Sequence, residues 1–239
     1  MIELQDKKVL VIDDDQTLQK LMEYALLQEG AKVAIASDGS EGLHKFYTDE
    51  PDLIILDIMM PHMDGRETCR HIRQYSKVPI VMLTAMGQDV DVVQALDNGV
   101  DDYVTKPFTV NVLLARIRAV LRRSDNVSSA EPICTYSDDY LSIDLKHRRI
   151  LTNGKPIKLT ATEHRLLAYL LENAGQVLTF KQILENVWGW EYQDNIDYVH
   201  VYISHLRRKL EETPKKPRYF LTEHGLGYRF DGKFRLGSS

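Results

Sequence analysis

Hydrophobic residues follow two different patterns along this chain, and the change of pattern divides the chain into two parts. In the first part, stretches with helical spacing separate five short apolar runs, at residues 9–12, 32–35, 53–56, 80–83 and 103–104. Strands that alternate with helices predict a parallel sheet covered on both faces. Five strands and five helices fit into these first 123 residues, so we expect a doubly wound α/β domain.

The second part has an α+β pattern. Strands are predicted at residues 140–144, 149–152 and 157–159, and Asn153-Gly154 has the composition of a tight hairpin turn. Thr160 and Glu163 have the spacing of a capping box, which begins the first of three helices, predicted at residues 160–171, 180–187 and 195–212. A glycine-containing hairpin follows, at residues 219–222 and 228–230. This order of elements is typical of a winged helix.

A polar segment joins the two parts. Residues 124–136 (SDNVSSAEPICTY) contain serine and proline without any periodicity, which favours a linker over the alternative of an ordered surface loop. We therefore predict domains at residues 1–123 and 137–233.

The charge of the chain is unevenly distributed. The formal net charge is −5, but residues 1–125 carry −7 and residues 126–239 carry +2. Residues 198–235 contain nine lysines and arginines against four acids, so a basic surface is expected near the C-terminus.

Several classes of protein are disfavoured by composition. No apolar run approaches the roughly 18–20 residues that a membrane helix needs, and residues 1–6 lack the features of a signal peptide. Cys69 and Cys134 have no metal-binding or redox spacing. We expect a cytoplasmic protein that is not bound to a membrane.

Polar residues follow the predicted strands of the first part where each strand ends. Asp13 and Asp14 follow the first strand, Asp57 ends the third, and Thr84 and Lys106 follow later strands. In an open parallel sheet these ends share one edge, where ligands bind. The sequence therefore predicts a pocket that contains three carboxylates, a hydroxyl and a lysine.

Such a pocket suits a divalent cation and a phosphoryl group. Clustered carboxylates repel one another, and Mg²⁺ prefers hard oxygen ligands. Asp57 is then the candidate nucleophile that forms an aspartyl phosphate, while Lys106 and Thr84 contact phosphoryl oxygens. Taken alone, residues 13–15 could instead form a solvated turn in which Asp15 caps a helix.

Four stretches carry a resemblance to a known family: VLVIDDD (9–15), DLIILDIMMPHMDG (52–65), VPIVMLTA (78–85) and GVDDYVTKPF (99–108). They resemble two-component receiver domains, which have a flavodoxin-like fold, and the whole chain resembles OmpR/PhoB response regulators. The resemblance implies that Asp57 is the phosphoacceptor and that Mg²⁺ is held by Asp13, Asp14, Asp57 and the carbonyl of Met59. It also implies a cis Lys106–Pro107 bond.

The same resemblance implies a conformational switch and a phosphorylation-dependent homodimer. Thr84 and Tyr103 would form the switch pair, with Lys106 sensing phosphate. The dimer face would include Asp97, Asp101, Asp102, Arg116, Arg118 and Arg122. Family members often pair a basic and an acidic residue at positions 92 and 112, where this chain has Val92 and Val112, so we expect an apolar contact there.

The helix predicted at residues 195–212 has an apolar and a polar face. A helical projection turns Val199, Ile203, Leu206 and Leu210 inward and Asp197, Val201, Ser204, His205 and Arg208 outward, with Tyr198, His200, Arg207 and Lys209 beside the outer face. The stretches at 159–190, 199–210 and 222–230 resemble the effector domain of the family. They imply a recognition helix within 195–210 and a wing within 219–230.

By this resemblance the helix and wing bind promoter DNA. The DNA half-sites would be direct repeats about one helical turn apart. Arg207, Arg208 and Lys209 would mostly contact phosphates, and Val201, Ser204 and His205 would contact bases. Arg229 belongs to the same predicted surface. Family members often have arginine where this chain has His205 and His224, so we expect a weaker wing contact or a changed half-site preference.

The expected function is transcription regulation rather than enzymatic catalysis. A sensor histidine kinase would be the phosphodonor, and RNA polymerase a further partner. Three alternatives remain open from the residues: a DNA binder that is independent of phosphate, a phosphohydrolase with an aspartyl nucleophile, and a protein-binding module in the second part. Met59 stands where many such hydrolases have a second acid, which disfavours the second alternative.

Overall fold

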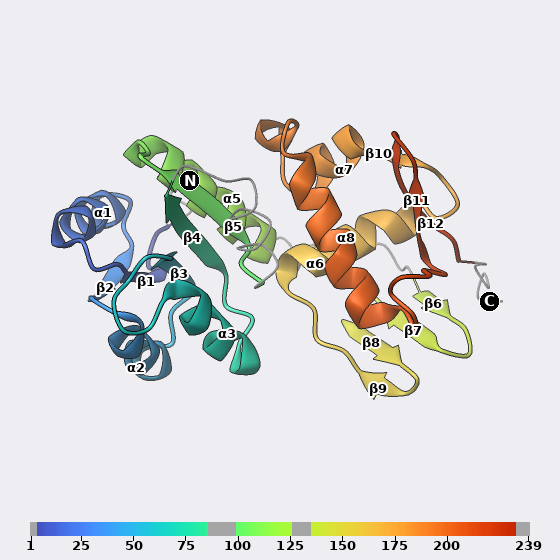
Figure 1. Cartoon of the computed structure of the whole chain (residues 1–239), viewed down its shortest axis with the longest axis horizontal. Helices are drawn as coiled ribbons and strands as arrows, with labels where there is room; N and C mark the ends of the chain where they lie inside the picture. Colours follow the sequence, from blue (N-terminus) through green and yellow to red (C-terminus); the bar gives the residue numbers. More distant parts are fainter. Residues whose placement is uncertain (1–3, 86–98, 126–134, 233–239) are drawn as a thin grey trace. The chain divides into compact units, whose positions relative to one another are not determined.

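The computed structural model describes residues 4–85, 99–125 and 135–232 of the chain. The chain divides into two compact units, Met1–Ser124 and Asp125–Ser239 (Figure 1). Within the described ranges, no helix combines the length and the apolar character that crossing a bilayer requires.

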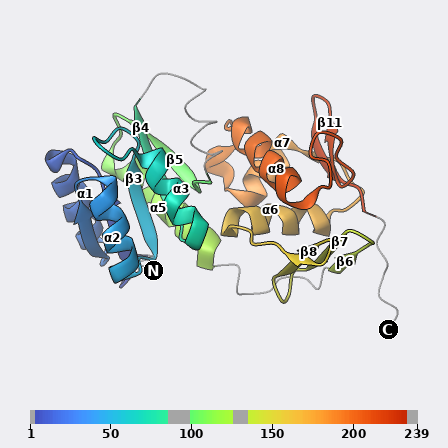
Figure 2. The same cartoon turned by 60° about the horizontal axis from the view of Figure 1, so that its bottom comes forward.

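The first unit is a five-stranded parallel sheet with helices on both faces (Figure 2). Its strands are β1 (Lys8–Ile12), β2 (Lys32–Ala36), β3 (Leu53–Asp57), β4 (Ile80–Ala85) and β5 (Asp102–Lys106), and its described helices are α1 (Gln16–Gln28), α2 (Gly39–Asp49), α3 (Gly65–Tyr75) and α5 (Val110–Asp125). The strand order β2-β1-β3-β4-β5 confirms the predicted doubly wound sheet. The remaining predicted helix falls on residues 86–98, outside the described part.

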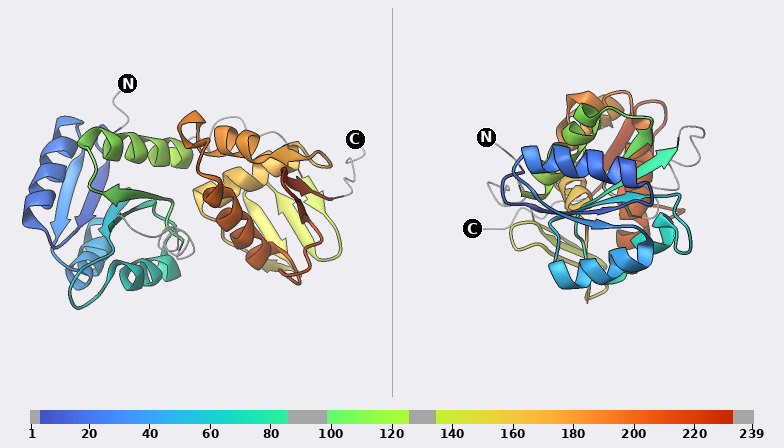
Figure 3. Two further views of the ribbon diagram at one scale, coloured as in Figure 1. Left: turned by 45° about the horizontal axis from the view of Figure 1, so that its top comes forward. Right: turned by 90° about the vertical axis from the view of Figure 1, so that its left-hand side faces the viewer.

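The main core of the first unit lies between the sheet and helices α1 and α5. Met22 and Leu26 of α1 and Ile117 of α5 are almost fully buried against alternate residues of the strands, among them Val11 and Ile55. Helices α2 and α3 contact each other and cover the opposite face (Figure 3). Because both faces are covered, the central strands are apolar except near their ends, where Lys8, Asp57 and Thr84 lie, which explains the continuous apolar runs in the sequence.

In its described residues, 135–232, the second unit contains two sheets and three α-helices. Strands β6 (Thr135–Ser137), β7 (Leu141–Asp144), β8 (Arg149–Thr152) and β9 (Lys155–Pro156) form an antiparallel sheet. The helices are α6 (Ala161–Glu172), α7 (Phe180–Val187) and α8 (Ile196–Leu210), with a 3₁₀ turn, η2 (Trp190–Tyr192), before α8. Strands β10 (Leu178–Thr179), β12 (Gly227–Phe230) and β11 (Phe220–Glu223) form the terminal sheet, so the winged helix is confirmed.

Local signals in the sequence account for several element boundaries. Asn153 and Gly154 have φ values of 47° and 74°, the left-handed conformation that a tight hairpin turn requires. Thr160 and Glu163 form the predicted capping box at the start of α6. Asp15 caps α1 by accepting from the backbone N–H groups of Thr17 and Leu18.

Two strands lie where sequence patterns indicate none. β6 begins at Thr135, inside the predicted linker, and pairs with β7 so that Tyr136 faces Ile143. β10 pairs with β12 through Leu178 and Tyr228. At the other end of the predicted linker, Ser124 still belongs to α5, and residues 126–134 lie outside the described part. The domain boundaries at 123 and 137 therefore stay a prediction.

The C-terminal end of α8 is tied to the first strand of the wing by one carboxylate. Glu211 is buried, and its side chain accepts hydrogen bonds from the backbone N–H groups of Arg218, Tyr219 and Phe220 at 2.8, 2.8 and 2.9 Å. Its extended backbone ends the helix at Leu210, two residues before the predicted end. A carboxylate that satisfies three backbone donors stabilises this corner strongly.

We predict that Glu211→Ala destabilises the second unit by about 3 kcal/mol, because it leaves buried N–H groups without an acceptor. The only two tryptophans of the chain, Trp188 and Trp190, lie in this unit, so urea unfolding followed by tryptophan fluorescence measures it selectively. Glu212→Ala, at the exposed neighbouring position, is the control and should stay within about 0.5 kcal/mol of the wild type. Equal stability of the two variants would contradict this role of Glu211.

A buried histidine in α6 makes the second unit sensitive to acid. His164 is 6% exposed, and burial, assisted by the charge of Arg148, lowers its pKa to about 4. In the unfolded chain the pKa is about 6.5. The unfolded state therefore binds more protons below pH 6.5, and stability is lost as the pH falls from about 6.5 to about 4.

We expect His164→Phe to remove this part of the pH dependence. Between pH 7.5 and 4.5, the wild type should lose about 2–3 kcal/mol more of its unfolding free energy than the variant does. Urea unfolding by tryptophan fluorescence at several pH values measures the difference. Parallel pH profiles for the two proteins would show that His164 is not the cause.

Candidate functional site

Three carboxylates gather at the carboxyl edge of the parallel sheet. Asp13 and Asp14 follow β1, and Asp57 is the last residue of β3. One oxygen from each of the three lies within 4.8 Å of the others. Asp13 and Asp57 are buried, at 0% and 4% exposure, whereas Asp14 is exposed. The sequence-predicted cluster is thus assembled in space.

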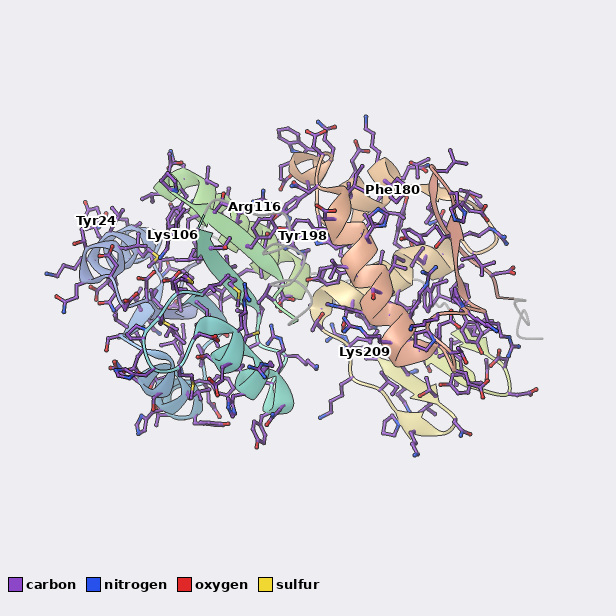
Figure 4. The ribbon with its side chains drawn as sticks, viewed as in Figure 1. Tyr24, Lys106, Arg116, Phe180, Tyr198 and Lys209 are labelled. Atoms are coloured by element: carbon purple, nitrogen blue, oxygen red, sulfur yellow. The ribbon has the colours of Figure 1, made fainter. Side chains whose placement is uncertain are left out.

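Lys106 links two of these carboxylates. Its Nζ lies 3.0 Å from Oδ2 of Asp13 and 3.0 Å from Oδ1 of Asp57. Lys106 ends β5, at the same edge of the sheet (Figure 4). The Lys106–Pro107 peptide bond that follows is cis, as the family resemblance predicts.

Burial and neighbouring charge act together on the groups of this pocket. Burial raises the pKa of Asp57, Lys106 opposes the rise, and the charges of Asp13 and Asp14 add to it. For Lys106, burial alone would lower the pKa, but the hydrogen bonds to Asp13 and Asp57 outweigh burial and raise it. The lysine therefore stays charged, and the pocket keeps an excess of negative charge that a cation can offset.

Gln19 of α1 holds the backbone of the pocket in place, although the sequence interpretation did not single it out. Its amide Nε2 donates to the carbonyl oxygen of Asp13 and, at 3.2 Å, to that of Ala36. The side chain is 9% exposed. The signal was present in the pattern, because Gln19 is a polar residue on the inward stripe that contains Met22 and Leu26.

The loop after β3 forms the outer wall of the site. A shallow pocket of about 490 Å³ is lined by Asp14, Ile58, Met59, Met60, Pro61, Asp64 and Arg66. Met59 is 71% exposed, so its side chain leaves the approach to the carboxylates open. Gly65 begins α3 at a place where a Cβ would lie 2.0 Å from the carbonyl oxygen of Asp57. Only glycine allows this close approach of the helix to the site.

The proposed switch residues lie on adjacent strands. Thr84 of β4 is 3% exposed, and its hydroxyl donates to the carbonyl oxygen of Ala85 at 3.4 Å. Tyr103 of β5 is half-buried and stands opposite Met82 of β4 in the strand register. The two residues therefore lie on neighbouring strands of one sheet, and their role as a switch pair stays a prediction.

Two aspartates of the predicted dimer face, Asp101 and Asp102, are buried. Asp101 is 3% exposed and forms an ion pair of 2.8 Å with Arg73. Asp102 is fully buried, with Arg116 at 3.6 Å and Arg123 at 3.4 Å. Cations of the same unit cover both aspartates, so their place on a dimer face stays a prediction.

The other residues of that face have varied environments. Arg118 pairs with Glu29 of α1 at 2.6 Å, and Arg122 is exposed. Val112 is 47% exposed, as an apolar contact residue should be in a monomer. Val92 and Asp97 lie outside the described residues.

Helix α8 buries the predicted inward stripe, but its exposed face is narrower than expected. Val199, Ile203, Leu206 and Leu210 are buried. The exposed positions include Asp197, His200, Ser204 and Arg208, which form one line along the helix. This line is the part of α8 that a nucleic acid could approach directly.

Three residues predicted on or beside the outer face of α8 are buried. Tyr198, Val201 and His205 are 1%, 5% and 5% exposed. The ring of Tyr198 packs against the rings of Trp188 and Tyr192. His205 lies beside Tyr202, with its Nδ1 3.7 Å from Glu163. The helical projection is therefore corrected at these positions, and the aromatic and ionic neighbours explain the burial of Tyr198 and His205.

Two of the predicted phosphate-binding cations form hydrogen bonds within the second unit. Arg207 donates to the carbonyl oxygen of Phe220 and to Thr222 Oγ1 at 2.8 Å, and lies over the ring of Tyr228. Lys209, labelled in Figure 4, donates to both carboxylate oxygens of Glu163 at 2.6 and 2.7 Å. They join α8 to the wing and to α6, so Arg208 is the exposed cation of this trio.

The wing presents few unpaired charges. His224 is exposed at the turn between β11 and β12. Arg229 is half-buried and pairs with Glu223 at 3.0 Å and with Asp231 at 3.2 Å. His200 of α8 is hydrogen-bonded to the Tyr228 hydroxyl at 2.8 Å, which fixes the wing against the exposed line of α8.

Both units match known protein families. Residues 9–118 match the response regulator receiver domain, and residues 154–230 match the C-terminal domain of transcriptional regulatory proteins. The chain is 43% identical over 222 residues to the KDP operon transcriptional regulatory protein KdpE of Escherichia coli (strain K12), covering 93% of this chain and 98% of that protein. It is also 43% identical over 235 residues to the probable transcriptional regulator ycf27 of Guillardia theta, covering 96% and 92%.

A solved structure supports the arrangement of domains along the chain. A mutant of RitR aligns over 95% of this chain and 100% of its own, with a TM-score of 0.76 at 27% sequence identity.

Proposed function

The chain belongs to the two-component response regulators that join a receiver domain to an OmpR/PhoB-type DNA-binding domain, and from its acidic pocket we propose that phosphorylation of Asp57 controls its activity. It is a transcriptional regulator, as its relatives are. The observation that carries the proposal is the convergence of Asp13, Asp14 and Asp57 within 4.8 Å, with Lys106 at 3.0 Å from two of them.

The donor set of this pocket fits Mg²⁺. Asp13, Asp14, Asp57 and the backbone carbonyl of Met59 are hard oxygen ligands, and the excess negative charge favours a divalent cation. When bound, Mg²⁺ would neutralise charge on the incoming phosphoryl group. Gln19 keeps the Asp13 backbone in position for this role.

Phosphoryl transfer requires a nucleophile and charge neutralisation. A carboxylate oxygen of Asp57 attacks the phosphorus of a phosphohistidine on the partner kinase, a P–O bond forms, and the P–N bond breaks. The electron pair returns to the imidazole nitrogen, which then takes up a proton. Lys106 remains charged and pairs with a phosphoryl oxygen.

The phosphorylated pocket would act on the dimer face through Thr84 and Tyr103. A new phosphoryl oxygen can accept a hydrogen bond from the Thr84 hydroxyl, which now reaches only the carbonyl of Ala85 at 3.4 Å. Movement of Thr84 leaves space beside β5 for the Tyr103 ring. The homodimer would then use Val112 and Arg122, together with aspartates released from their present ion pairs.

DNA binding is assigned to α8 and the wing. His200, Ser204 and Arg208 form the exposed line for major-groove contact, and His224 is at the wing tip. Direct-repeat binding by a dimer and contact with RNA polymerase are further parts of the proposal.

We predict that the full chain takes up one phosphoryl group from acetyl phosphate in the presence of Mg²⁺, and that Asp57→Asn takes up none, because the amide is not a nucleophile. Intact mass and Phos-tag gels measure the product, and EDTA should abolish it. Thermal unfolding of Asp57→Asn controls for folding. Phosphorylation should increase the affinity for a selected DNA site at least about tenfold, which corresponds to about 1.4 kcal/mol.

An unchanged DNA affinity after verified phosphorylation would favour a binder that is independent of phosphate. Phosphorylation of Asp57→Asn to the wild-type level would place the acceptor elsewhere.

We expect alanine substitutions at the neighbouring residues Arg207 and Arg208 to have contrasting effects. Arg207→Ala should destabilise the DNA-binding domain by about 1–3 kcal/mol, because it removes the hydrogen bonds to Phe220 and Thr222. Arg208→Ala should cost less stability than Arg207→Ala, because Arg208 is exposed, and should reduce the slope of log affinity against log salt concentration by about 0.9, the value for one phosphate contact. Urea unfolding and fluorescence anisotropy at several KCl concentrations measure the two effects. The reverse result would refute the assignment of these two side chains.

A further inference from the structure

A second group of cations lies on the four-stranded sheet of the DNA-binding domain, in sequence far from α8. Lys146 and Arg148 occupy the turn between β7 and β8, Arg149 begins β8, and Lys158 follows β9; all four are exposed. We call these four residues the sheet cluster.

Strand pairing brings the sheet cluster together. The backbone N–H of Ile157 donates to the carbonyl of Ile150 at 2.8 Å, so Lys158 and Arg149 are next to each other on neighbouring strands. The turn with Lys146 and Arg148 leads directly into Arg149. Four positive charges, two from the turn, one from β8 and one from the residues after β9, therefore share one end of the sheet.

The domain offsets the charge of the sheet cluster only in part. Within the described residues, none of the four forms an ion pair with a carboxylate. Asp144 stands opposite Arg149 in the strand register, and its hydrogen bonds with His147, together with the charge of Arg149, lower its pKa. An anionic partner would reduce the remaining repulsion among the four cations.

The chemistry of this surface fits phosphates better than a protein partner. The exposed large hydrophobic residues of this domain, in the part that the structure describes, are Val177, Trp190, Ile196 and Leu226. None of them belongs to the four-stranded sheet. Protein interfaces need a buried apolar or aromatic centre, whereas a phosphate backbone is bound through exposed lysine and arginine alone.

The sheet cluster is near one end of α8 but on another face. Helix α6 lies between the sheet and α8 (Figure 2). Lys209, in the last turn of α8, binds Glu163, whose carboxylate also accepts from the backbone N–H of Thr160 at 2.7 Å. Thr160 is two residues from Lys158. The C-terminal end of α8 and the sheet cluster thus meet at the start of α6.

We propose that the sheet cluster binds the phosphate backbone of the DNA that flanks the half-site contacted by α8. The domain would then hold one duplex on two surfaces, with the flank curving around the start of α6. This inference rests on the proposed contact of α8 with DNA. Phosphate contacts by the sheet cluster would replace those expected of Arg207 and Lys209, whose side chains form hydrogen bonds within the domain. Bending the flank requires energy that additional phosphate contacts can supply.

The test compares a triple variant, Lys146→Gln/Arg149→Gln/Lys158→Gln, with the wild type on duplexes of two lengths. The probe is a site selected by the wild type from random-sequence DNA, prepared once ending at the site and once with about one and a half helical turns of mixed sequence on each side. Fluorescence anisotropy at several KCl concentrations gives affinity and salt slope.

For the wild type, the long duplex should bind with a salt slope steeper than that of the short duplex by about 3.6, since each of the four phosphate contacts contributes about 0.9. The advantage of the long duplex should therefore fall about 150-fold between 50 and 200 mM KCl. The triple variant should keep only the slope difference due to Arg148, about 0.9, and bind the short duplex as the wild type does.

The matched control is Lys20→Gln/Lys32→Gln/Arg70→Gln, which removes three exposed positive charges from the receiver. It should keep the advantage of the long duplex, which excludes an effect of net charge alone. Unfolding by tryptophan fluorescence verifies that the triple variant is folded.

Other outcomes overturn the proposal in distinguishable ways. A triple variant that keeps the length dependence shows that the sheet cluster does not bind flanking DNA. A triple variant that binds both lengths more tightly than the wild type would show that these cations oppose DNA binding, which also overturns the proposal. If the wild type binds neither duplex, the proposed DNA contact of α8 itself fails.

Discussion

The balance of charge among Asp13, Asp57 and Lys106 is the interaction on which the chemistry of this protein depends. Carboxylates held this close in a buried site repel each other, and the low polarity of their surroundings strengthens the repulsion. The ammonium of Lys106, 3.0 Å from both, offsets part of it and leaves a net demand for a cation. A phosphoryl group on Asp57 would change this balance, so the same arrangement that fits a divalent cation would also detect phosphorylation.

Several charged side chains of the DNA-binding domain form contacts within the domain that stabilise its fold. Lys209 neutralises the buried Glu163, Arg207 joins α8 to the wing, and Glu211 satisfies three backbone donors at the start of β11. These contacts fix α8 relative to the wing, as the proposed contact of both elements with DNA would require. As a consequence, fewer cations of α8 face solvent. Under our proposal, the sheet cluster supplies further contacts with DNA phosphates.

Much of the fold and of the pocket could be predicted because both follow from short-range pattern and from the geometry of parallel sheets. The apolar runs specify strands, and parallel strands necessarily bring Asp13, Asp57 and Lys106 to one edge. Strand β6 could not be predicted, because three residues form a strand only through pairing with β7. Gln19 was overlooked for a related reason: its partner, the carbonyl of Asp13, becomes evident only when α1 is packed.

The sequence by itself determined the two domains, the order of their elements and the kinds of groups in the acidic pocket. The tertiary structure alone decided which charged residues face solvent. Asp101 and Asp102 are covered by arginines from α3 and α5, and His205 lies beside Glu163 of α6. The physical reason is that helical periodicity defines the direction of a side chain, whereas its burial depends on which distant element packs there and whether that element carries a compensating charge.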